Sequence, residues 1–79
     1  MLLEQISMFS RIAKEQSISK AAQAIHISQP ALSQQMQRLE EELGVKLFER
    51  SNRGIILTRA GEVMQKYSEQ FLETYSNLK

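Results

Sequence analysis

One predicted helix begins with several neutral polar side chains. These side chains can form hydrogen bonds with a surface that presents a defined arrangement of donors and acceptors. Gln29, Ser33, Gln34 and Gln37 follow the expected cap Ser28 on a face with little apolar content. Amides and hydroxyls on such a face suit the base edges of a DNA major groove, where Gln pairs with adenine and Ser donates or accepts. The alternative is that Gln29 and Gln34 are ordinary solvent-facing helix residues.

The segment after this helix carries an excess of positive charge. The whole chain has a net charge of +1, but residues 44–61 contain one acid, Glu49, and four bases: Lys46, Arg50, Arg53 and Arg59. A local excess of this kind beside a polar helix is what a surface that contacts DNA phosphates requires. A solvated loop could have the same excess, so charge alone leaves both interpretations open.

The composition offers no catalytic set and no metal site. The 79 residues include no Cys, and His26 is the single histidine. We therefore expect no enzyme activity, no metal and no cofactor. No apolar run approaches the roughly 18 residues of a membrane span, and residues 1–4 lack the layout of a signal peptide. These features predict one small cytoplasmic domain with no membrane partner.

Two helices are predicted before the polar one. The first runs from about residue 2 to residue 15, because its apolar residues recur at spacings of four, three and four: Leu2, Ile6, Phe9 and Ala13. Ser19 is the expected N-cap of a short second helix over residues 20–25. His26 and Ile27 are expected to form the turn that follows.

The polar helix also has an apolar side. Ser28 is its expected N-cap, Pro30 fits in its first turn, and Gly44 is expected to end it. Its apolar residues repeat at four, three and four: Leu32, Met36, Leu39 and Leu43. This side is predicted to pack on the core, which leaves the polar side free.

A two-stranded hairpin is predicted next. Residues 46–49 and 55–57 are short apolar strand candidates, and residues 51–54 supply the turn. An isolated hairpin is marginally stable, so we expect it to be stabilised by packing against the helices. Val45, Leu47 and Phe48 are the expected anchors.

A long last helix is predicted from Arg59, after the cap Thr58, to near Lys79. Ala60 begins its apolar side, which we expect to form a dimer interface at Met64, Tyr67, Phe71, Leu72, Tyr75 and Leu78. A helix of this length would span about 30 Å, more than so small a core can cover. The alternative is that the helix folds back and buries these residues within one domain.

The order of these motifs resembles the N-terminal domain of LysR-type transcriptional regulators. The shared pattern is AA-x-x-I-H-I-SQPALS-x-x-M-x-x-LE-x-x-LG-V-x-LF-x-R followed by LT-x-AGE, and it runs essentially the whole chain. The resemblance implies a mainly α fold: a winged helix-turn-helix with a three-helix core, a two-stranded β wing and a long C-terminal linker helix. It implies a DNA-binding domain at residues 1–58 and a linker and dimerisation helix at 59–79, with the effector-binding domain absent from this chain.

The resemblance also assigns contacts. The start of the third helix enters the major groove, so the implied base contacts are Gln29, Pro30, Ala31, Ser33 and Gln34. The implied backbone and wing contacts are Lys20, Ser28, Gln37, Arg50, Arg53 and Thr58. Gln34 stands where the family frequently has Arg or Lys, which favours adenine recognition there. Arg50 could instead pair with an acid of the run Glu40–Glu42.

The expected function is therefore sequence-specific binding of double-stranded DNA by a homodimer that regulates transcription in a bacterium. The expected operator is an interrupted inverted repeat, and a small-molecule effector would act only through the missing C-terminal domain. The alternative is a helical protein-interaction module that dimerises through its last helix. A dimer that binds no duplex would favour that alternative.

Overall fold

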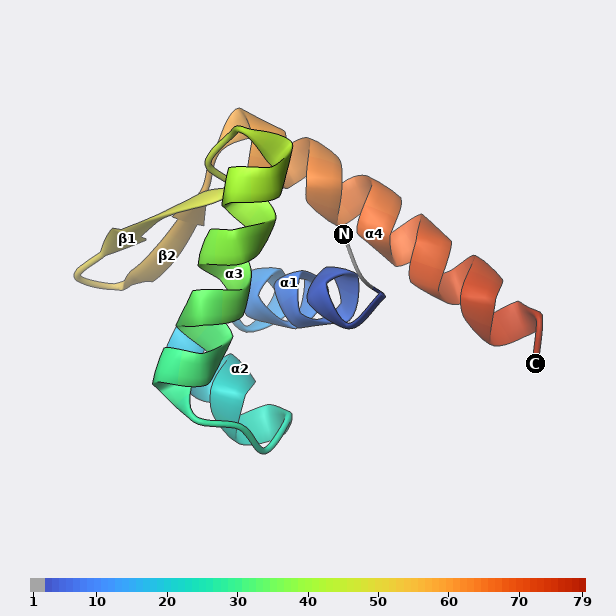
Figure 1. The fold of residues 1–79 in the computed structure, drawn as a ribbon, viewed down its shortest axis with the longest axis horizontal. Helices are drawn as coiled ribbons and strands as arrows, with labels where there is room; N and C mark the ends of the chain where they lie inside the picture. The colour runs from blue at the N-terminus through green and yellow to red at the C-terminus, as the bar shows by residue number, and fades with distance from the viewer. Residues whose placement is uncertain (1–2) are drawn as a thin grey trace.

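The computed structural model describes residues 3–79, which form four helices and one two-stranded antiparallel sheet. The order along the chain is α1 (Leu3–Glu15), α2 (Ile18–Ala24), α3 (Gln29–Leu43), β1 (Phe48–Ser51), β2 (Gly54–Leu57) and α4 (Arg59–Asn77). The first three helices pack together, the hairpin projects beside α3, and α4 runs away from them (Figure 1). The predicted mainly α fold with a two-stranded wing is confirmed. Leu2, expected at the start of the first helix, lies outside the described residues.

The core lies where α1, α2 and α3 meet the base of the hairpin. Its largest fully buried side chains are Phe9, Ile12, Leu32, Met36, Leu39 and Leu47. Ala21 and Ala22 are also buried, and their small side chains let α2 approach its neighbours closely. Since Leu32, Met36 and Leu39 hold one side of α3 against this core, the opposite side of α3 faces solvent.

The start of α2 differs from the sequence prediction. Ser17, rather than Ser19, is the N-cap, and its Oγ accepts a hydrogen bond from the backbone N–H of Lys20 at 3.1 Å. The helix therefore begins at Ile18, whose side chain is buried in the core. The expected cap at Ser19 was wrong because the chain must turn early enough to bury Ile18.

The boundaries of α3 agree with the prediction. Ser28 caps the helix by accepting from the N–H of Ala31 at 3.1 Å, and Gly44 ends it with a left-handed φ of 74°. Leu43 remains 38% exposed and Val45 46% exposed, so neither is the buried residue that the sequence indicated. The left-handed turn at Gly44 reverses the chain there and leaves both flanking side chains at the surface.

The first strand of the hairpin lies two residues further along the chain than predicted, at Phe48–Ser51 in place of residues 46–49, whereas the second strand ends at Leu57 as predicted. β1 and β2 pair in a register that sets Phe48 opposite Leu57 and Ser51 opposite Gly54. Leu47 and Phe48 anchor its base in the core as expected. The N–H of Ile55 also donates to the carbonyl of Gln16 at 3.2 Å, which ties the hairpin to the α1–α2 connection.

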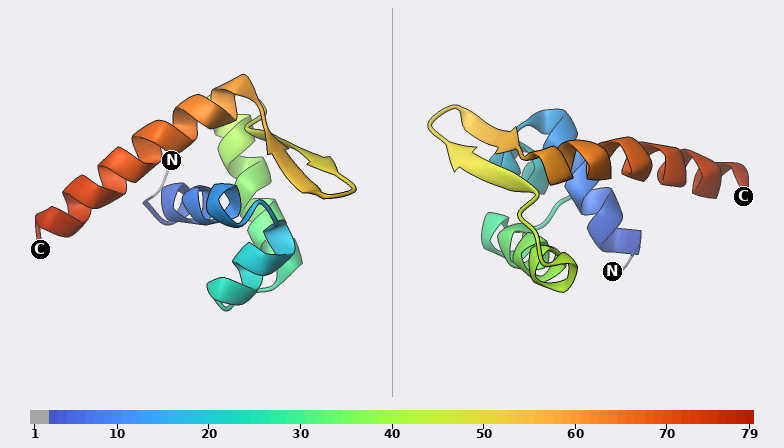
Figure 2. Two further views of the ribbon diagram at one scale, coloured as in Figure 1. Left: turned by 180° about the vertical axis from the view of Figure 1, so that it is seen from behind. Right: turned by 90° about the horizontal axis from the view of Figure 1, so that it is seen from above.

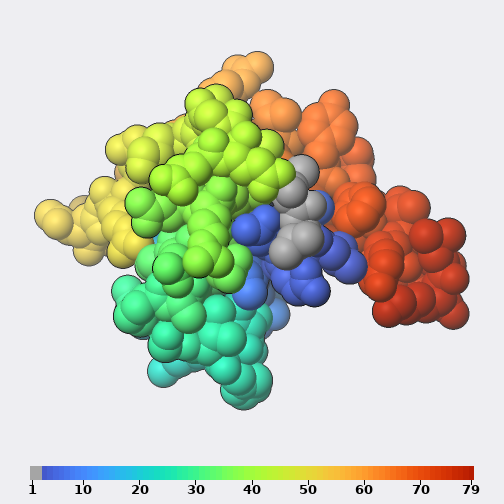
Figure 3. Space-filling view, in the orientation of Figure 1, coloured from blue at the N-terminus to red at the C-terminus, as the bar shows by residue number. Residues whose placement is uncertain are grey.

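The last helix starts at a capped junction and extends past the core. The Oγ1 of Thr58 accepts from the N–H of Gly61 at 3.0 Å, as a cap should. The first half of α4 lies across α1, and its C-terminal end points away from the other helices (Figure 2). In the space-filling view this end projects at one side of the molecule (Figure 3). No helix within residues 3–79 is long and apolar enough to cross a membrane.

Candidate nucleic-acid interface

The first turns of α3 present the predicted base-contacting residues to solvent. Because Ser28 caps the helix and Leu32 is fully buried, the first turn is fixed in direction while its outer side stays free. The residues on this outer side that are exposed are Gln29, Pro30, Ala31, Gln34 and Gln37. Ser33 belongs to the same surface but is only partly exposed.

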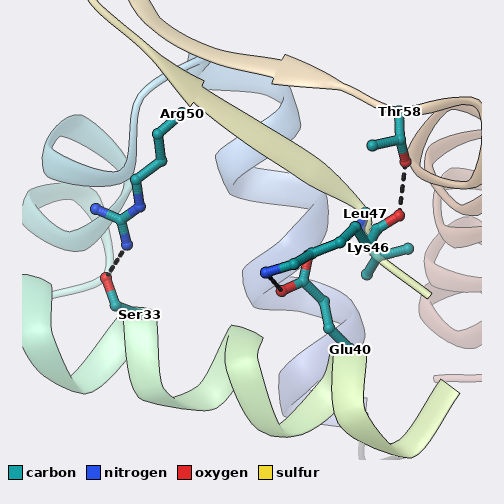
Figure 4. Close-up of polar contacts among 6 residues, drawn as sticks. All are labelled: Ser33, Glu40, Lys46, Leu47, Arg50 and Thr58. Atoms are coloured by element: carbon teal, nitrogen blue, oxygen red, sulfur yellow. Dashed lines mark hydrogen bonds and ion pairs between the residues drawn. The ribbon is translucent and has the colours of Figure 1, made fainter. Parts of the chain in front are cut away.

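Ser33 is partly covered because the wing contacts it. Arg50 extends from β1 toward α3, and its Nη2 donates to the Oγ of Ser33 at 2.8 Å (Figure 4). This contact joins residues 17 positions apart and brings the basic wing beside the neutral polar helix. The two features that sequence analysis identified separately therefore form one surface.

Two surface hollows meet at Arg50. One lies between α3 and the base of the wing, and its lining includes Ser33, Gln37, Lys46 and Arg50. The other lies between the start of α2, the start of α3 and the wing; its lining is Ser17, Ile18, Ser19, Gln29, Arg50, Ser51, Gly54 and Ile55. The surface is therefore continuous from α2 across α3 to the wing.

The acidic run on α3 is not paired with Arg50 in this structure. Glu40 instead accepts from the N–H of Leu47 at 2.7 Å and lies 3.9 Å from the Nζ of Lys46. These contacts fix the loop between α3 and β1 (Figure 4). The alternative pairing of Arg50 with the glutamates is wrong, and its guanidinium lies at the polar surface.

The remaining predicted backbone contacts lie around this surface. Lys20 in α2, Ser28 at the cap of α3 and Arg53 in the wing turn are all exposed. The wing turn is held by Ser51, whose Oγ accepts from the N–H of Arg53 at 3.2 Å. Ser51 was predicted to lie in this turn, where Ser is common, and the structure adds the hydrogen bond by which its hydroxyl holds the turn.

Thr58 is partly buried, and its side chain forms hydrogen bonds within the protein. Its Oγ1 donates to the carbonyl of Lys46 at 2.7 Å in addition to capping α4 (Figure 4). A contact between Thr58 and DNA remains a prediction.

The apolar residues of α4 are divided between two sides of the helix. Gly61 and Ser68 are buried, and Met64 packs against the core cluster. Leu72 and Tyr75 are half-buried. On the outer side Tyr67 is 59% exposed, Phe71 47% and Leu78 79%, with Val63 at 45%. The alternative in which the helix folds back and buries its distal apolar residues is therefore wrong for this chain.

The sequence matches a known family of regulators. Residues 3–62 fit the family described as "Bacterial regulatory helix-turn-helix protein, lysR family". A "Probable RuBisCO transcriptional regulator" of Cyanidioschyzon merolae is 49% identical over 70 residues, 89% of this chain and 23% of that protein. The "HTH-type transcriptional regulator IlvY" of Escherichia coli is 40% identical over 77 residues, 98% of this chain and 26% of that protein. This chain thus spans about a quarter of the length of these curated relatives.

Solved structures agree with the fold. The "BenM_DBD/catB site 1 DNA Complex" superposes with a TM-score of 0.95 at 38% identity, covering 99% of this chain and 88% of that one. "CbnR, a LysR family transcriptional regulator" superposes with a TM-score of 0.92 at 40% identity, covering 98% of this chain and 27% of that one. At these identities the likeness extends to sequence as well as to fold.

Proposed function

We infer the function from the premise that this chain belongs to the lysR family of bacterial regulatory helix-turn-helix proteins. Its fold is that of the DNA-binding domain of LysR transcriptional regulators. We propose that it binds double-stranded DNA as a homodimer at an interrupted inverted repeat and thereby regulates transcription. The proposed division is residues 1–58 for DNA contact and residues 59–79 for the linker and dimerisation helix.

The observation that carries the proposal is the joining of α3 to the wing. Gln29 and Gln34 are exposed on α3, and Arg50 extends from the wing to the same helix. Neutral hydrogen-bonding groups on a helix read base edges, while basic groups on a flanking wing hold phosphates. BenM, whose DNA-binding domain was solved in complex with DNA, has the same fold at 38% identity.

The proposed assignment of contacts follows this division of chemistry. Base contacts are assigned to Gln29, Pro30, Ala31, Ser33 and Gln34. Contacts with the DNA backbone are assigned to Lys20, Ser28, Gln37, Arg50, Arg53 and Thr58. Arg53, at the exposed wing turn, is free to reach a phosphate or the minor groove.

Dimerisation is proposed through the outer side of α4. Tyr67, Phe71 and Leu78 expose apolar surface along a helix of 19 residues, which spans about 28 Å. Pairing two such helices would cover this surface and set two copies of α3 on one duplex. The two half-sites would then lie about 34 Å apart, or a multiple of that distance.

The relatives are transcriptional regulators, which supports a role without catalysis. Action in the cytoplasm remains a prediction, as does a response to a small-molecule effector, which would require residues beyond these 79.

Hydroxyl-radical footprinting tests the proposed function. An operator selected by the protein from random duplexes should show two protected blocks on one face of the DNA, separated by one or more helical turns. A single block would contradict the dimeric arrangement. No protection of any selected duplex would contradict DNA recognition by this domain.

A further inference from the structure

The contact between Arg50 and Ser33 constrains the hydroxyl of Ser33. Arg50 lies in β1, where its backbone is paired with Ile55, and its Nη2 is 2.8 Å from the Oγ of Ser33. A guanidinium has only donors, so the Oγ of Ser33 must be the acceptor in this hydrogen bond. The hydroxyl hydrogen therefore points away from Arg50.

The same contact changes what Ser33 can offer to a partner. A hydroxyl that accepts from a cation is polarised, which makes its own hydrogen a stronger donor and its oxygen a weaker second acceptor. Without Arg50, the hydroxyl of Ser33 would rotate freely and could serve either role. With Arg50 in place, Ser33 acts as a donor on the surface of α3.

We propose that Arg50 is a positioning residue for base recognition, and that it makes Ser33 a donor to an acceptor atom on a base edge. The inference rests on the proposed function and adds which partner donates in the hydrogen bond between Ser33 and the base. In the major groove the acceptors are N7 and O6 of guanine, N7 of adenine and O4 of thymine, whereas cytosine presents an amino donor. Ser33 should therefore favour a base with an acceptor and disfavour cytosine.

The position of Arg50 also couples the wing to α3. Arg50 lines both hollows, one shared with Ser33 and Gln37 and the other with Gln29 and the start of α2. A shift of the wing on DNA would move the guanidinium that orients Ser33. Base recognition at this one position thus depends on wing placement, which a simple phosphate contact would not require.

The test compares base preference in four variants of the 79-residue protein. Duplexes are first selected from a random pool by the unmodified protein and by S33A, which identifies the base pair that Ser33 contacts. Binding is then measured on four duplexes that differ only at that pair, for the unmodified protein, S33A, R50M and S33A/R50M. R53M is the matched control, because Arg53 is also an exposed basic wing residue. Circular dichroism verifies that each variant is folded.

The expected result is a loss of preference at the same base pair in R50M and S33A. Each should reduce the ratio of best to worst duplex by about three- to tenfold, the effect of one hydrogen bond, and the double variant should lose no more. R53M should weaken all four duplexes alike and keep the ratio.

Two outcomes would overturn the inference while leaving the proposed function intact. One is that R50M weakens all four duplexes equally and keeps the ratio, which would make Arg50 a phosphate contact only. The other is that S33A changes no position of the selected sequence. If the unmodified protein selects no sequence at all, the proposed function fails and the inference fails with it.

Discussion

The backbone of Gly61 lies against the carbonyl oxygen of Leu47 so closely that a β-carbon at position 61 would overlap that oxygen. The contact sits where α4 meets the loop before the wing. Thr58 secures the same junction, since its N–H donates to the Leu47 carbonyl at 3.0 Å and its hydroxyl to the Lys46 carbonyl at 2.7 Å. The wing and α4 are therefore joined by a backbone approach that only glycine permits.

Replacing Gly61 with Ala should destabilise the fold. The added methyl group must displace the Leu47 carbonyl, and overpacking of this kind costs about 1–3 kcal/mol. Urea unfolding at a fixed protein concentration measures the change, because dimer formation would make stability depend on concentration. The control is Q70A at an exposed position of α4, which should stay within about 0.5 kcal/mol. Equal effects of G61A and Q70A would contradict the close approach.

The cap of α2 gives a second prediction. S17A should lower the free energy of unfolding by about 1 kcal/mol, because it removes the acceptor for the Lys20 N–H. S19A should have little effect, since Ser19 is exposed within the helix. Thermal unfolding of the two variants side by side checks this. A larger loss of stability for S19A than for S17A would indicate that Ser19 is the N-cap, as the sequence predicted.

Substitution of a residue that contacts bases should affect DNA binding differently from substitution of a residue that contacts phosphates. Q29A should relax preference at one base pair, with about 1–3 kcal/mol lost on the preferred duplex and little on random DNA. R53M should weaken both duplexes alike and reduce the magnitude of the log–log salt slope by about 2, because one phosphate contact is lost from each protomer of the dimer. Equilibrium titrations on preferred and random duplexes measure both. Equal losses on the two duplexes for Q29A would remove it from the proposed readers.

The exposed side of α4 predicts a dimer that a single charge can disrupt. F71E should shift the protein toward monomer and weaken DNA binding, because it places a carboxylate in the proposed apolar interface. Q70E adds the same charge at the adjacent exposed residue and should leave the dimer intact. Sedimentation velocity distinguishes the species. A monomeric unmodified protein, or one whose dimer is unaffected by F71E, would contradict pairing through this face.

Much of the fold followed from local patterns in the sequence. Ser28, Gly44 and Thr58 define element ends through their own backbone and cap chemistry, so their roles were predicted. Ser17 and Ser19 are equally good caps, and the choice depended on burying Ile18, which is a tertiary effect. Val45 was expected to anchor the wing, but the left-handed turn at Gly44 leaves it exposed.

The relation between the parts of the site required the structure. The sequence placed Ser33 on the polar helix and Arg50 in the basic wing, but their contact depends on how the wing docks. Likewise, the apolar residues of α4 formed a single side in the sequence pattern. In the structure Met64 packs on the core, whereas Tyr67 and Phe71 face solvent. These contacts depend on how separate helices and strands pack together, and a local sequence pattern does not encode that packing.

The most direct test of base recognition by a dimer is a fluorescence-anisotropy salt titration with two duplexes. One carries an interrupted inverted repeat with a T at one end and an A at the other, and the second is a scrambled control. We expect tighter binding to the repeat at every salt concentration. The slope of log binding constant against log salt concentration should be about −7 if each protomer neutralises about four phosphates. Equal affinities with the same slope would show that binding is electrostatic and independent of sequence, which would contradict base recognition by α3.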